Sequence, residues 1–260
     1  MIYRTVALFG LVLLSVSALT SAADLTAEQT AALVRKLDEK QRNSGDYQSL
    51  AYMRETEKGK EPRLYQIAVY RRDEDNKFMI LFTKPKEEAG KGYLKIDKNL
   101  WMFDPNTGRW ERRTERERIG GTNSRRGDFD ESRLAEEYTT TYEGQGTLGD
   151  YKTHRLKLTA KEGTDVAYPL LKLVVDQKDE NILQREEYSL SGRVMRTTFY
   201  PKWQKKFSPS KKSDVWIPEE MRIFDELEKG NSTVILIKET DLNSLSANIF
   251  TKAWIESKSK

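Results

Sequence analysis

The stretch that decides the fold is KPKEEAGKGYLKIDKNLWMFDPNTGRWERRTERERIGGTNSRRGDF, which runs from Lys84 to Phe129. It predicts three short strands at 91–97, 99–104 and 109–114. Strands this close in sequence pair as antiparallel neighbours, because a parallel crossover needs about a dozen or more residues. The middle strand is apolar at every position from Leu100 to Phe103, which indicates that both of its faces are covered.

The same two-residue alternation continues on both sides of this stretch. Short clusters of turn residues, such as Ser191-Gly192, separate the alternating segments. The further predicted strands are 47–57, 63–72, 77–84, 138–146, 151–160, 170–176, 182–190, 193–200, 216–227 and 232–240. Strands joined by short turns form a meander, so we expect a mainly β, α+β protein with a single curved antiparallel sheet.

Three segments have helical periodicity instead. Residues 24–43 form an amphipathic pattern that begins with a capping box, in which Thr26 is followed three residues later by Gln29. Residues 130–137 predict a short helix after the basic loop, and residues 247–257 predict a C-terminal helix. We expect the N-terminal, mid-chain and C-terminal helices together to cover one face or one mouth of the sheet.

The N-terminus has the features of a cleavable signal peptide. A positive start at Arg4 is followed by an apolar stretch of about 14 residues, short of the ~20 that span a bilayer, and by small residues at Ser21–Ala23. A membrane anchor is the alternative interpretation. We expect cleavage of residues 1–23, a mature domain of residues 24–260, and a soluble periplasmic product.

The sequence contains little that suggests catalysis. It has no cysteine and a single histidine, His154, which alternates with leucines in a predicted strand. One histidine cannot form a catalytic triad or a multi-histidine metal site. We therefore expect no catalytic residues, no metal and no cofactor, although a hydrolase that uses two carboxylates stays an alternative. Arg126-Gly127-Asp128 is interpreted as a loop whose glycine allows an unusual backbone angle.

Charge and apolar pattern leave two questions open. The net charge of +4 is too small to predict nucleic-acid binding. Between Arg109 and Arg126 there are seven arginines and three glutamates, which form either a solvated strand face or a basic rim that meets anionic lipid or a membrane partner. The methionines and aromatic residues of the strands suit either a closed core or an adaptable site for acyl chains.

The segment GKGYLKIDKNLWMFDP, followed by an arginine-rich strand, a glycine-containing loop and Asp128-Phe129, resembles the LolA-like outer-membrane lipoprotein-sorting proteins. These are periplasmic relatives of the lipoprotein carrier LolA and the receptor LolB. The resemblance implies an unclosed β-barrel whose concave, apolar side is capped by helices and receives acyl chains. It also implies an inner-membrane transporter that supplies the cargo, an outer-membrane acceptor and transient membrane contact.

On this basis the sequence predicts a periplasmic lipid or lipoprotein carrier that acts as a monomer, with a non-catalytic accessory protein of an envelope transporter complex as the alternative. The candidate cavity residues are Trp101, Phe103, Leu171, Leu173, Met195, Phe199, Met221, Ile223, Val234 and Leu236. The candidate basic rim and lid loop consists of Arg116, Arg118, Arg125 and Arg126. A one-residue error in register would exchange the two faces of any strand.

The expected start of the mature chain is directly testable. N-terminal sequencing of the exported protein should begin at or near Asp24, and the protein should fractionate with soluble periplasmic proteins. A chain that still begins at Met1 and fractionates with integral membrane proteins would support the anchor instead.

Overall fold

The computed structural model describes residues 24–96, 99–114 and 116–259. The predicted signal peptide, residues 1–23, lies outside them. The helices are α1 (Ala27–Gln41), α2 (Leu134–Glu137) and α3 (Lys252–Lys258), and the short 3-10 turns are η1 (Ile119–Gly121) and η2 (Arg126–Asp128). The strands are β1 (Asp46–Thr56), β2 (Arg63–Arg72), β3 (Lys77–Lys84), β4 (Gly92–Ile96), β5 (Asn99–Asp104), β6 (Arg109–Arg113), β7 (Tyr138–Leu148), β8 (Tyr151–Ala160), β9 (Leu170–Asp176), β10 (Ile182–Tyr188), β11 (Val194–Ser208), β12 (Ser213–Asp225) and β13 (Ser232–Asp241).

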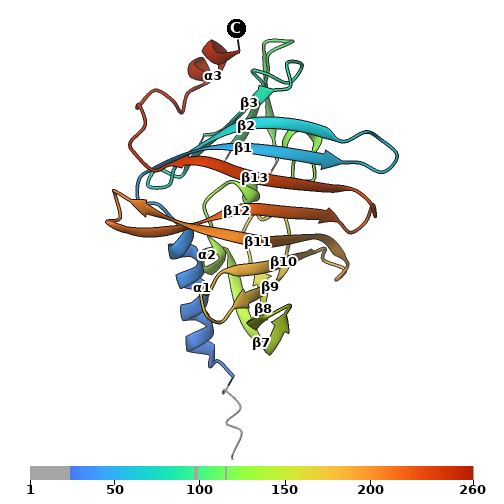
Figure 1. Ribbon diagram of the computed structural model, residues 1–260, viewed down its shortest axis with the longest axis vertical. Helices are drawn as coiled ribbons and strands as arrows, with labels where there is room; N and C mark the ends of the chain where they lie inside the picture. Colours follow the sequence, from blue (N-terminus) through green and yellow to red (C-terminus); the bar gives the residue numbers. More distant parts are fainter. Residues whose placement is uncertain (1–23, 97–98, 115, 260) are drawn as a thin grey trace, which may run out of the picture.

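All strands of the described chain belong to one antiparallel, 13-stranded sheet in the order β6-β5-β4-β3-β2-β1-β13-β12-β11-β10-β9-β8-β7. Two meanders build it: β1 to β6 step outward in one direction, and β7 to β13 return from the opposite edge. They meet where Ala51 of β1 pairs with Ile237 of β13. The edges β6 and β7 are not paired with each other, so the curved sheet is an unclosed barrel, as predicted (Figure 1).

The two faces of the sheet have separate cores. On β3, Phe78 and Ile80 belong to the larger cluster on the concave face, whereas Met79 belongs to a smaller cluster on the other face. The larger cluster includes Leu33 of α1, and the smaller one includes Ile255 of α3. Helix α3 therefore covers the outer face of the β2–β6 half. It does not share a face with α1, because α1 and α3 dock on opposite sides of the strands.

A glycine of the segment that resembles the LolA-like proteins makes the docking of α3 possible. A Cβ atom on Gly92 would lie 2.7 Å from Cγ2 of Ile255, too close for any side chain. On the same face the Nζ of Lys252 lies 4.0 Å from the ring centre of Trp101, and Trp110 Nε1 donates a 2.7 Å hydrogen bond to Glu256. Strands β4 to β6 thus hold the C-terminal helix by close packing and by aromatic contacts.

The hairpin of β11 and β12 is longer than the sequence predicts. The predicted strands end at residue 200 and begin again at residue 216, whereas β11 continues to Ser208 and β12 begins at Ser213. Pro201 is the reason for the error, because a proline normally ends a central strand. Here the pairing register shifts between Phe199 and Lys202, and this irregularity takes the proline out of the ladder.

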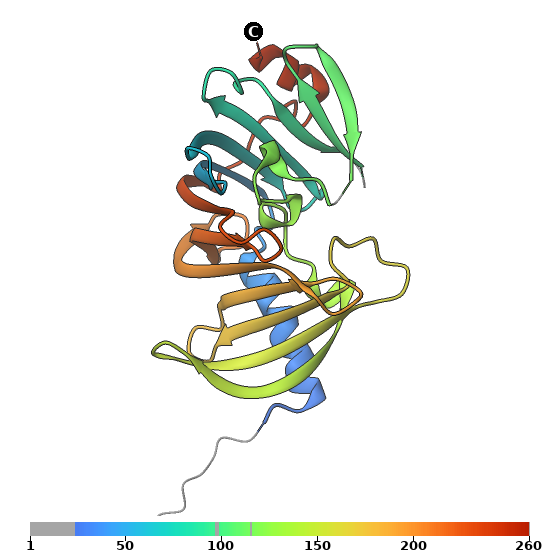
Figure 2. The same ribbon diagram turned by 90° about the vertical axis from the view of Figure 1, so that its right-hand side faces the viewer.

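Residues 116–137, which we call the crossing segment, lead from β6 to β7 along the concave face. Figure 2 shows this segment in green inside the curve of the sheet, with α1 below it. Gly120 lies so close to the sheet that a Cβ atom there would meet Cζ of Phe82 at 2.6 Å, and its φ of +61° also favours glycine. Its N–H donates a 3.0 Å hydrogen bond to the hydroxyl of Tyr93.

The face assignment of β13 can be tested with two neighbouring residues. Ile235 is fully buried on the concave side, whereas Leu236 is 36% exposed on the outer side. We expect Ile235→Ala to lower the free energy of unfolding by about 2–5 kcal/mol, because it leaves a cavity in the core. Leu236→Ala should cost about 1 kcal/mol or less. Urea denaturation measures both, and equal losses would contradict this assignment of faces.

Candidate functional site

The crossing segment is fastened to the β7–β13 half of the sheet by a buried carboxylate. Asp128, in η2, accepts two hydrogen bonds from Arg196 of β11, from Nη1 to Oδ2 at 2.7 Å and from Nη2 to Oδ1 at 2.9 Å. Arg185 of β10 donates a third at 2.7 Å, and the backbone N–H of Arg125 a fourth at 2.8 Å. The side chain of Asp128 has no exposed surface. A carboxylate held by a bidentate arginine is among the strongest polar contacts in proteins.

A second carboxylate keeps the two arginines together. Glu187 of β10 forms ion pairs with Arg196 and, at 3.0 Å, with Nε of Arg185. Glu187 and Arg196 are direct cross-strand partners, so the pairing of β10 with β11 sets their contact. Two arginines and two carboxylates balance in charge. Burial would raise the pKa of Asp128, but the positive charges of Arg196 and Arg185 and their hydrogen bonds lower it below 3.8, so this carboxylate is ionised at neutral pH.

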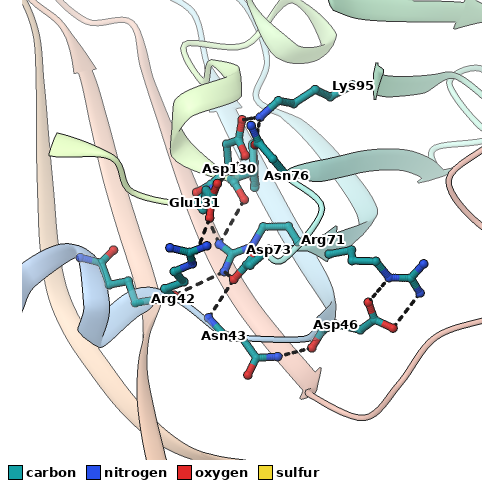
Figure 3. A network of polar contacts seen from close by, with 12 residues as sticks. Arg42, Asn43, Asp46, Arg71, Asp73, Asn76, Lys95, Asp130 and Glu131 are labelled. Atoms are coloured by element: carbon teal, nitrogen blue, oxygen red, sulfur yellow. Dashed lines mark hydrogen bonds and ion pairs between the residues drawn. The ribbon is translucent and has the colours of Figure 1, made fainter. Parts of the chain in front are cut away.

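The other half of the sheet holds the next turn of the crossing segment. Arg71 of β2 forms a bidentate pair with Asp73 at 2.9 and 3.0 Å, and it reaches the backbone carbonyls of Phe129 and Asp130. Lys95 of β4 lies 3.0 Å from the carboxylate of Asp130. Figure 3 shows how these contacts converge on the chain around Asp130. Successive parts of the segment are therefore bound to the two halves of the sheet.

Helix α1 holds the end of the crossing segment. Asp38 accepts hydrogen bonds from the hydroxyl of Ser132 at 2.6 Å and from the backbone N–H groups of Leu134 and Ala135 at 3.0 and 2.8 Å. The two N–H groups belong to the first turn of α2, where no acceptor within the helix is available to them. Burial raises the pKa of Asp38 above 3.8 despite these hydrogen bonds. The predicted helix 130–137 is thus confined to Leu134–Glu137, and its cap comes from another helix.

A cavity of about 170 Å³ lies between the crossing segment and the sheet. Its lining combines apolar and charged residues. The apolar and aromatic lining includes Tyr47, Val69, Tyr168, Leu171, Ile182, Tyr200, Trp203, Ile217, Met221 and Ile237, and the charged lining includes Arg71, Arg125, Asp128, Asp130, Arg185, Glu187 and Arg196. Ligand pockets for drug-sized molecules usually hold about 300–1,000 Å³. A long acyl chain therefore needs the crossing segment to move.

The structure brings part of the predicted cavity set to this side of the sheet. Leu171 and Met221 line the cavity. Leu173 and Ile223 are buried in the concave core, and Met195 packs against its margin.

The remaining predicted cavity residues lie elsewhere. Phe103 is buried in the cluster on the outer face, beneath α3, and Trp101 lies on the same face of β5 under Lys252. Phe199 contacts the ring of Phe224 in a shallow depression on the outer face. Val234 and Leu236 also face outward, because Ile235 and Ile237 of the same strand belong to the concave core.

The predicted basic rim is also divided. Arg116 is exposed, and Arg118 is partly exposed and paired with Asp225 at 2.8 Å. Arg125 donates a 2.8 Å hydrogen bond to the hydroxyl of Tyr168, and Arg126 is buried beside Asp130 at 3.3 Å. The crossing segment forms the cover of the concave face. Arg125 and Arg126 lie inside this cover rather than on an exposed rim, because the chain just before them, residues 122–124, is buried against the sheet.

Sequence analysis missed the residues that hold the cover in place, above all Arg185, Arg196 and Asp128. A signal was present: Glu187 and Arg196 flank the predicted Ser191-Gly192 turn at positions that pair across a hairpin. Asp128 belongs to the tripeptide interpreted as a loop with an unusual glycine angle. Gly127 has no positive φ, and the tripeptide forms the 3-10 turn η2.

Three further findings bear on function. Within residues 24–96, 99–114 and 116–259, no group of three or more Asp, Glu or His side chains is arranged to hold a metal ion. None of the helices described here has the length and apolar character to cross a membrane. The single histidine, His154, lies on β8, where its Nδ1 is 3.0 Å from the hydroxyl of Tyr142.

Solved structures share this architecture. A LolA superfamily protein from Nitrosomonas europaea matches with a TM-score of 0.72 at 22% identity, over 86% of this chain and 98% of its own. A putative outer membrane lipoprotein-sorting protein domain from Vibrio parahaemolyticus matches with 0.76 at 16% identity, over 89% and 100%. A DUF1329 family protein from Desulfovibrio piger matches with 0.77 at 18% identity, over 88% and 98%. None of the curated proteins matches this chain.

The unclosed sheet with its covered concave face therefore defines a protein of the LolA-like fold class, and the predicted resemblance to the LolA-like proteins is confirmed at the level of the fold. A protein-family model with the description "Uncharacterized protein" matches residues 74–257, more than half of the chain. The chain belongs to that family.

The cap that α1 supplies to α2 leads to a prediction. Asp38→Ala removes the acceptor for three donors of the cover, which should lower the free energy of unfolding by about 1–3 kcal/mol and speed amide hydrogen exchange in residues 132–137. The matched control is Glu39→Ala, because the Glu39 side chain is 65% exposed and its ion pair with Lys211 is long, at 3.8 Å. Equal exchange rates in the two variants would show that Asp38 does not hold the cover.

Proposed function

We propose that the protein is a carrier that holds the acyl chains of a lipid or lipoprotein between the concave face of the sheet and the crossing segment. The observation that carries this proposal is the construction of the cover. The sheet contributes apolar residues such as Leu171 and Met221 to the cavity wall. The cover above them is largely charged, and polar contacts through Asp128, Asp130 and Asp38 hold it in place. Such contacts have alternative partners in water, whereas a packed apolar core has none.

Transfer between a membrane and such a cavity needs little net driving force. Each buried CH₂ contributes about 0.8 kcal/mol in either apolar environment, so the two sides nearly balance. Direction then depends on the partners that open the cover at each membrane. We propose an inner-membrane transporter as donor, an outer-membrane acceptor and transport through the periplasm, in keeping with the LolA-like fold.

Two glycines at the start of the crossing segment would allow the cover to move. Gly120 and Gly121 both have positive φ values, of 61° and 78°, and no side chain crowds Gly121. Beyond them, Asp128 and Asp130 are bound by separate arginine and lysine partners on the two halves of the sheet. We propose that the cover swings from this glycine pair when those contacts are exchanged for contacts to cargo or partner.

The carrier proposal predicts that the protein binds lipid and that a bulky side chain in the cavity reduces this binding. Ala167 lines the cavity from the loop between β8 and β9, and it is only partly buried. Ala167→Trp should fill the space and reduce binding of a hydrophobic fluorescent probe several-fold, with little change in melting temperature. The control is Ala253→Trp, an equal change on the exposed side of α3.

Mass spectrometry of organic extracts from the purified protein supplies the second measurement. Lipid should co-purify with the wild type and with Ala253→Trp, and much less with Ala167→Trp. If a folded wild type carries no lipid and binds no probe, the accessory-protein alternative replaces the carrier. Turnover of an ester or a glycoside that persists through repurification would favour a hydrolase.

A further inference from the structure

We propose that Asp128 occupies the place of a ligand's anionic group, so that Arg185 and Arg196 recognise the carboxylate or phosphate of an amphiphile whose chain enters the cavity. This inference rests on the proposed carrier function and deepens it, because it specifies the headgroup chemistry and the event that releases the cover.

The geometry at Asp128 is that of a bound anion. Arg196 grips its two oxygens at 2.7 and 2.9 Å, Arg185 adds a contact of 2.7 Å, and the Arg125 N–H adds one of 2.8 Å. The planar guanidinium presents paired donors that fit carboxylate and phosphate oxygens equally well. Arg185 and Arg196 lie on strands of the sheet, whereas Asp128 and the Arg125 N–H belong to the cover and would leave together.

The arginine pair has its own support on the sheet. Glu187 contacts Arg196 Nη2 at 2.8 Å and Arg185 Nε at 3.0 Å, so it holds both guanidinium groups from within the sheet. Arg196 also lies 5.8 Å from the ring centre of Tyr168. When Asp128 withdraws, the two arginines keep these contacts and still point at the vacated place.

Charge balance couples anion entry to release of the cover. With Asp128 in place, two arginines face two carboxylates. Without it, one positive charge is left unbalanced in a buried site, and this is costly unless another anion replaces the carboxylate. A ligand anion therefore competes with Asp128 for the same donors and favours the open position of the cover, because it binds only that position.

The neighbouring surface indicates an amphiphile rather than a small ion alone. Arg185, Arg196 and Asp128 line the same cavity as Leu171, Ile182 and Met221. A headgroup at the arginines would thus lead its chain along apolar residues of β9, β10 and β12. Because charged and apolar residues line one cavity, the site favours a molecule that has both an anionic headgroup and an apolar chain.

The test compares four probes, each a monomer in solution: laurate, the uncharged monolauroylglycerol, acetate and inorganic phosphate. Binding is followed by tryptophan fluorescence, since Trp203 and Trp216 line the cavity, and by hydrogen exchange in residues 116–137. Wild type should bind laurate more tightly than monolauroylglycerol. Asp128→Asn weakens the internal competitor, so it should raise the affinity for laurate about tenfold, within the usual range of coupling between sites.

Asp130→Asn is the matched control, because Asp130 is a buried carboxylate of the same segment that pairs with Lys95 and Arg126 instead. It should change the affinities for laurate and monolauroylglycerol by the same factor. Arg185→Gln tests the receptor side without changing a residue of the cover, although it also removes one contact to Asp128. A looser cover affects both lauroyl probes alike, so the readout is their ratio. Laurate should weaken about tenfold relative to monolauroylglycerol, which keeps the proposal testable even when Asp128→Asn does not fold.

The outcomes separate this inference from the carrier proposal. Equal binding of laurate and monolauroylglycerol in all folded variants would overturn the anion site and leave the carrier intact. Acetate or phosphate that bound as tightly as laurate would overturn the amphiphile and leave a small-anion site. Absence of binding by either lauroyl probe in every variant would instead overturn the proposed function itself.

Discussion

The pairing of β1 with β13 is the constraint on which the rest of the structure depends. It joins the start of one meander to the end of the other, so the two edge strands, β6 and β7, lie at opposite ends of the sheet. The chain between them must then span the width of the sheet, because β7 follows β6 directly in sequence, and residues 116–137 do so along the concave face. The cover is therefore part of the connectivity of the fold. Whatever side chains the crossing segment carries become the inner surface of the cavity.

That segment carries charge, and this sets how the concave side behaves. Buried ion pairs add little net stability compared with apolar packing, whereas losing one partner is costly. Asp128 and Asp130 thus give the cover one well-defined position and make departure from it a discrete step. A cover packed by leucines alone would leave the apolar wall permanently closed. The charged contacts instead allow exchange for other polar partners, which is the property that the carrier proposal requires.

The outer face has the opposite construction. There α3 packs on Gly92 and on the aromatic side chains of β5 and β6, and Lys252 lies against Trp101. This arrangement explains why apolar residues of β5 that resemble a cavity wall in sequence serve as a support for the C-terminal helix. Because α3 protects these strands from outside, the concave face is left to α1 and the crossing segment.

The sequence by itself determined the positions of the strands and the antiparallel meander, since alternation and turn residues are local signals that each hairpin shows independently. It located Leu171 and Met221 on the concave side. It named Val234 and Leu236 as cavity residues where the structure has Ile235 and Ile237 on the concave side, because that run is apolar at every position and only pairing with β1 fixes its register. The contact between Asp128 and Arg196 spans 68 residues, and no local pattern encodes it. Only the passage of the chain across the concave face brings these two charges together. That passage is needed because β1 pairs with β13, which leaves β6 and β7 at opposite edges of the sheet.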